Sequence, residues 1–77
     1  MEITDSDLDA LQAAYKAAVE ALIAAIRSEE ALASVPHDVA ELDKWEAAHF
    51  AVEEARTAAA AAKTEYEDGL RRRFFQF

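Results

Sequence analysis

Large apolar side chains recur every three or four residues along the first third of the chain. An average step of about 3.6 residues is the period of an amphipathic helix. Thr4 stands just before this stripe as an N-cap, and Asp7 occupies the N3 position. The pattern predicts a helix over about residues 5–33, with a stripe made of Leu8, Leu11, Tyr15, Val19, Leu22 and Ile26.

A second apolar stripe follows the single proline. Pro36 disfavours helical geometry in the residue before it, so we expect a connector over about 34–37 and a second helix over about 38–73. Gly69 is a possible end of this helix. The i,i+4 pairs Glu67–Arg71 and Asp68–Arg72 favour continuation instead. The stripe comprises Leu42, Trp45, His49, Val52, Ala55, Ala59, Ala62, Tyr66 and Leu70.

Two helices of similar length joined by a short connector predict an antiparallel hairpin, an all-α fold. A pivot near Pro36 leaves the residues after about Leu70 without a partner in the first helix. The register that follows from this pivot pairs Ile26 with Trp45, Leu22 with His49, Val19 with Val52, and Leu11 with Ala59 or Ala60.

The core of such a hairpin is thin. The chain has 77 residues and is 53% hydrophobic, but twenty of its residues are alanine, which contributes little burial. Small domains need reinforcement, and a chain with no cysteine cannot form disulfides. Self-association is the remaining route, so we expect a homodimer that forms a four-helix bundle.

Charge is distributed unevenly. The net charge is −8, yet residues 1–70 carry −11 and the last seven residues carry +3. An acidic body disfavours direct binding to nucleic-acid phosphates. The N-terminus lacks a signal-peptide pattern and no apolar run reaches the ~20 residues of a membrane span. We therefore expect a cytoplasmic protein that does not bind membranes.

Residues 71–77, here called the basic end, combine the residue types enriched at binding hot spots. Either the other subunit or a different protein is a possible partner, and local capping of the bundle is a third alternative. Phe50 is predicted to point away from the helix seam, among acidic side chains, and is a second candidate. The candidate partner-binding residues are Phe50, Arg71, Arg72, Arg73, Phe74, Phe75 and Phe77.

Glu46 and His49 are weak candidates for a metal site. A Glu-x-x-His motif supplies ligands to di-iron bundles, but such sites also need an inward glutamate from each remaining helix. The predicted register places Leu22 and Ile23 there instead. His49 is better explained as a packed histidine, and His37 as a solvated connector residue. No cofactor is expected.

Enzyme chemistry is not expected. No Ser or Cys nucleophile is spaced with a histidine and an orienting acid, and there is no Gly-rich phosphate loop. No loop is long enough to line a pocket for a small-molecule substrate. The sequence therefore favours a non-catalytic protein–protein interaction module, such as an adaptor, a chaperone, or an inhibitor of the kind that small bacterial or phage genes encode.

The alternatives concern nucleic-acid pathways and metals. The architecture is similar to that of Rop-type RNA-binding hairpins, which are dimeric four-helix bundles, although it shares no motif with them. RNA binding of that type needs basic residues along one face, whereas those of this body are scattered among acids. An acidic mimic of DNA suits the charge better, and a metal-dependent oxidase rests on Glu46 and His49 alone. The scattered basic residues are Lys16, Arg27, Lys44, Arg56 and Lys63.

Overall fold

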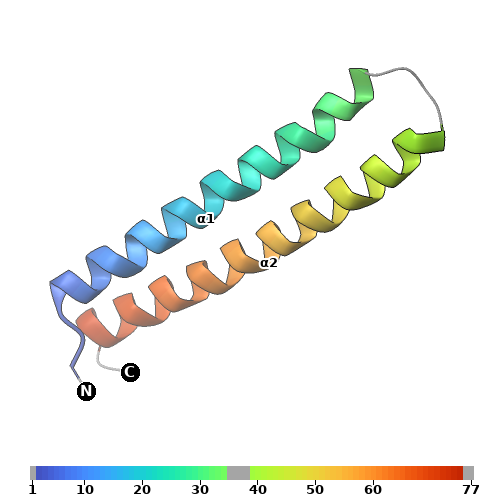
Figure 1. Cartoon of the computed structure of the whole chain (residues 1–77). Coiled ribbons are helices and arrows are strands. Elements are labelled where there is room, and N and C mark those ends of the chain that lie inside the picture. The colour runs from blue at the N-terminus through green and yellow to red at the C-terminus, as the bar shows by residue number, and fades with distance from the viewer. Residues whose placement is uncertain (1, 35–38, 76–77) are drawn as a thin grey trace.

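The computed structural model describes residues 2–34 and 39–75, and these form an antiparallel helical hairpin (Figure 1). Helix α1 spans Asp5–Ala31, the short 3-10 helix η1 spans Leu32–Ser34, and α2 spans Val39–Phe74. The two long helices pack against each other, and no strand occurs in the described ranges. The predicted all-α hairpin is confirmed. The predictions for Pro36 and His37 concern positions outside the described residues.

Helix α1 begins at a complete capping box. The Thr4 amide donates to Asp7 Oδ2 at 2.9 Å, and the Asp7 amide donates to Thr4 Oγ1 at 3.1 Å. Both bonds satisfy amides that a helix start otherwise leaves unpaired. The Thr4 bonds, that from its backbone amide foremost, lower the pKa of the Asp7 carboxyl below its ordinary value. The box thus fixes where α1 starts.

Helix α2 continues through Gly69 to Phe74 without a break. Gly69 is buried, and a Cβ added to it would lie 2.8 Å from Leu11 Cδ1 and 3.2 Å from both Ile3 Cδ1 and Leu8 Cδ2. The glycine therefore makes room for three side chains from the start of the chain. Its role here is close packing between helices, not helix termination.

The predicted register is wrong. Leu11 lies against Gly69, roughly two to three turns beyond the expected Ala59 or Ala60. The Tyr15 and Tyr66 rings stack with centroids 6.3 Å apart, and Gln12 Nε2 donates to Tyr66 Oη at 3.3 Å. These contacts centre the pairing near residue 40 instead of Pro36. The helix bounds, Ala31 and Val39, would by themselves centre the pairing at 35. The close packing of Leu11 against Gly69 sets the register instead, so α2 extends past the end of α1 at the connector.

The predicted overhang of the second helix is wrong for the same reason. Arg73 Nε donates to Asp5 Oδ1 at 3.0 Å, so the last turn of α2 lies level with the first residue of α1. Figure 1 shows the blue start of α1 beside the red end of α2. The start of α1 and the end of α2 are therefore level with each other where both termini lie.

The hairpin is a rod of 55 × 15 × 14 Å with a radius of gyration of 17.3 Å. A compact domain of this length would have a radius of gyration of only ~11 Å. Leu8, Val52 and Ala59 are the buried apolar side chains among the described residues, and no large side chain there is fully buried. Two helices alone leave most of each apolar stripe partly in contact with solvent.

Candidate functional site

Packing differs between the two halves of the rod. The interhelical ring stack and the side-chain hydrogen bonds between described residues of α1 and α2 all lie in the half near the termini. The half near the connector has Val52 as its buried apolar side chain. It also holds Glu29 Oε2, a buried oxygen without a hydrogen-bond partner in the described structure. A buried oxygen without a hydrogen-bond partner costs free energy, so the packing between the helices is less complete in this half.

Large apolar side chains are exposed on this connector half. Ile23 and Ile26 of α1 are each 43% exposed, whereas Leu42 and Phe50 of α2 are 61% and 66% exposed. Trp45 is half-buried. Sequence reasoning placed Ile26 and Trp45 opposite each other in the core, and the displaced register separates them. These five residues are here called the connector flank.

The helices present this surface on the same side of the hairpin. Residues of a helix can be placed by their angle around the helix axis, counted from the seam in the N- to C-terminal direction. In two antiparallel helices, residues at the same angle from the seam lie on the same flank of the pair. Ile23 follows the half-buried Leu22 by one residue, or ~100°. At 100° per residue, Trp45 and Leu42 lie about 20° and 80° around the α2 axis from the buried Val52. The direction of rotation from the seam is the same as that of Ile23 on α1. Both helices thus contribute to one flank.

A depression on α2 marks the outer edge of this flank. Trp45, Glu46, His49 and Phe50 line an open space of about 480 Å³. All four belong to a single helix, so it is a surface hollow and not an enclosed pocket. Phe50, two residues before Val52, lies ~200° away from it on the opposite side of α2. The prediction that Phe50 points away from the seam agrees with this exposed position.

His49 is exposed, so the prediction of a histidine packed in the hairpin seam is wrong. Its ring lies 6.1 Å from the Phe50 ring, centroid to centroid. In the described part of the chain, no three His, Asp or Glu side chains gather closely enough to hold a metal ion. Glu46 and His49 therefore share the depression as a pair without a third ligand from those residues.

The basic end is partly engaged within the chain. Arg71 Nη1 pairs with Asp68 Oδ1 at 2.7 Å, an i,i+3 pair instead of the expected i,i+4 pair with Glu67. Arg73 contacts Asp5, and its guanidinium also lies 5.4 Å from the centre of the Phe74 ring. Phe74 and Phe75 remain 61% and 67% exposed. Phe77, the seventh candidate, lies outside the described residues.

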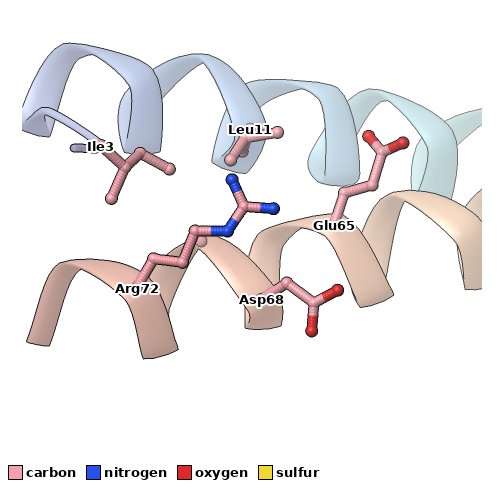
Figure 2. A pocket seen from close by; sticks show the side chains of 6 residues that line it. Ile3, Leu11, Glu65, Asp68 and Arg72 are labelled. Carbon is pink, nitrogen blue, oxygen red and sulfur yellow. The ribbon is translucent and has the colours of Figure 1, made fainter. Parts of the chain in front are cut away.

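Arg72 contributes to a small cleft between the helices (Figure 2). Its side chain extends from α2 toward Leu11 on α1, with Ile3 and Gly69 completing an apolar floor. Glu65 and Asp68 stand at the edge, and Asp68 points away from α1. The volume is about 250 Å³, below the ~300–1,000 Å³ of most ligand pockets. Sequence reasoning missed this cleft because its wrong register separated Leu11 from Gly69.

Neither α1 nor α2 combines the length and apolar character that crossing a membrane requires, and the same holds for the other described residues. Comparison of the chain with protein-family models, curated proteins and solved structures found no match in any of the three.

Proposed function

We propose that the protein is a non-catalytic protein–protein interaction module that works as a homodimer, with two hairpins forming a four-helix bundle. Apolar surface that the single hairpin leaves unburied carries this proposal. The solvent-accessible surface of the chain is 5952 Å². A compact protein of 8.5 kDa would expose only ~4,700 Å².

The surplus is thus about 1,300 Å², and a stable interface removes ~800 Å² from each partner. One dimer contact of ordinary size therefore accounts for most of it. Exposed leucine, isoleucine and phenylalanine side chains supply the apolar area that drives such association. The absence of cysteine adds support, because disulfides cannot stabilise the hairpin instead.

A dimer of this kind leaves the basic end available for a second protein. Phe74 and Phe75 are exposed beside three arginines, and this combination is enriched at binding hot spots. An acidic or mixed surface on a partner would complement the arginines. Adaptor, chaperone and inhibitor roles all fit such a surface.

The acidic DNA mimic is less well supported by the charge density. A net charge of −8 spread over 55 Å is about one charge per 7 Å, compared with ~1.7 Å per charge in duplex DNA. Even a side-by-side dimer would reach only about half the duplex value. The metal-dependent alternative has no observation in its favour beyond Glu46 and His49.

Sedimentation equilibrium of the full chain, from low micromolar to millimolar concentration, tests the proposal. We expect the mass to rise to twice that of the chain and to stop there. A monomer mass throughout this range would refute the homodimer. A mass that keeps growing with concentration would indicate open-ended association and would refute the closed four-helix bundle.

A further inference from the structure

We infer that the two copies join through the connector flank, formed by Ile23 and Ile26 of α1 and by Leu42, Trp45 and Phe50 of α2. This inference rests on the proposed homodimer and adds the face by which it forms. The occupant of this surface is a second copy of the same chain.

The uneven packing of the rod selects this face. Near the termini, a ring stack, two hydrogen bonds and the Gly69 contact already close the seam. Near the connector, four large apolar side chains are between 43% and 66% exposed. Burying them against another hairpin would cover the apolar surface that the single chain leaves exposed in this half.

The shape of the flank also suits a bundle. A four-helix bundle needs each hairpin to offer an apolar face that draws on both of its helices. Ile23 and Ile26 provide the α1 part, and Leu42 and Trp45 provide the α2 part of the same side. A partner helix laid across α2 alone would meet Leu42, Trp45 and Phe50, and would leave both isoleucines in water.

Charge argues against the opposite end as the contact between copies. In a two-fold interface, a residue near the axis meets its own copy. The basic end would therefore bring Arg72 against its own copy, beside Arg71 and Arg73, whose charges Asp68 and Asp5 offset in part, so like charges repel there. The five residues of the connector flank carry no charge, and the nearby Arg56 is 3.8 Å from Glu53. The surplus accessible surface of about 1,300 Å² on each chain also exceeds the ~800 Å² that a two-fold contact of ordinary size removes from each partner.

Two charge-introducing variants and one matched control test this face. Phe50→Glu and Ile23→Glu place a carboxylate on the α2 and α1 parts of the flank. Phe74→Glu makes the same kind of change at the other end, where the side chain is 61% exposed and Phe50 is 66% exposed. Sedimentation equilibrium should give at least a tenfold higher dissociation constant for each flank variant. The control should dimerise like the unchanged chain.

Trp45 provides a second readout, because it is the only tryptophan in the chain. Diluting the unchanged protein through its dimer–monomer transition should shift the Trp45 emission to longer wavelength as water reaches the ring. This measurement decides the question even if a flank variant fails to fold, which circular dichroism would reveal as lost helicity.

The outcomes separate the two proposals. A monomer at every concentration refutes the homodimer itself, and with it the interface. A dimer that both flank variants leave intact refutes the connector flank alone. The connector flank is also refuted if the dimer dissociates on dilution without any change in Trp45 emission. It is refuted as well if Phe74→Glu disrupts the dimer and Phe50→Glu does not.

Discussion

Arg73 and Asp5 join the two ends of the hairpin through a hydrogen-bonded ion pair at 3.0 Å. Asp5 is the first residue of α1, where a negative charge favours the positive end of the helix dipole. Arg73 is in the last turn of α2, where a positive charge favours the negative end. Antiparallel packing places these two ends together, so each charge stabilises its own helix end and also pairs with the opposite charge on the neighbouring helix.

This ion pair should contribute little to the overall stability. The Arg73 and Asp5 side chains are 38% and 75% exposed, and water screens exposed pairs. We expect Arg73→Gln and Asp5→Asn, combined in a double-mutant cycle, to give a coupling free energy below ~1 kcal/mol. Urea unfolding at low and high salt measures it, and the coupling should shrink with salt. A larger coupling that ignored salt would contradict the exposed geometry.

Gly69 should tolerate only a small side chain. Alanine gains up to ~1 kcal/mol in helix propensity, but its Cβ must displace the terminal methyl groups of Leu11, Leu8 and Ile3. We expect Gly69→Ala to be close to neutral, and Gly69→Leu to lower the free energy of unfolding by ~1–3 kcal/mol through overpacking. Ala61→Leu, an exposed position on the same helix, is the matched control and should unfold like the unchanged chain.

Engineered cysteines should report the register directly, because the chain has none of its own. A Cβ at position 69 would lie 2.8 Å from Leu11 Cδ1, which brings the two Cβ positions near the separation that a disulfide needs. Leu11→Cys with Gly69→Cys should therefore oxidise to an intramolecular disulfide. Leu11→Cys with Ala59→Cys, the pairing expected from a pivot at Pro36, should not. Mass spectrometry of tryptic fragments without reduction distinguishes the two.

Acid should weaken the start of α1. The Thr4 hydrogen bonds hold the pKa of Asp7 below its ordinary value. The ionised carboxylate therefore adds stability above the ordinary carboxyl pKa of ~3.9, and this is lost as the pH falls through the lower folded value. Asp7→Asn should reduce the acid sensitivity of urea unfolding measured at fixed protein concentration. Asp9→Asn removes a carboxylate outside the capping box, and an equal reduction there would argue against the box.

Salt should strengthen the proposed dimer. Each copy carries a net charge of −8, so two copies repel at low ionic strength. Screening shortens from ~30 Å at 0.01 M salt to ~10 Å at 0.1 M, while burial of apolar side chains continues to drive association. Sedimentation equilibrium at several salt concentrations should show the dissociation constant falling. A dissociation constant that rose with salt would mean that ion pairs hold the copies together.

The sequence predicted the helices because their signals are local. The stripe from Leu8 to Ile26 and the cap at Thr4 depend on neighbours within a few residues. The register depends on contacts between distant residues, and an alanine-rich seam offers few side chains large enough to indicate it. Helical periodicity could not predict the contact between Leu11 and Gly69, because it treats glycine only as a helix breaker.

The candidate surfaces divide in the same way. The exposure of Phe50 followed from its position in the helical repeat, two residues from Val52. The exposure of Ile26 and His49 did not, because both belong to the apolar stripes and lose their expected partners when the register moves. A stripe predicts which residues can face a neighbour. It does not predict whether that neighbour is the same chain or another one.

The difference in packing between the two halves of the rod predicts a gradient in amide hydrogen exchange. Local opening is easiest where few apolar side chains are buried. In dilute solution, amides near Leu8 and Gly69 should exchange slowly, whereas those around Ile26 and Trp45 should exchange fast. Concentration should slow the second group selectively, because a second hairpin covers it. The helix segments least stable in the single chain would then be those whose order depends on meeting another copy.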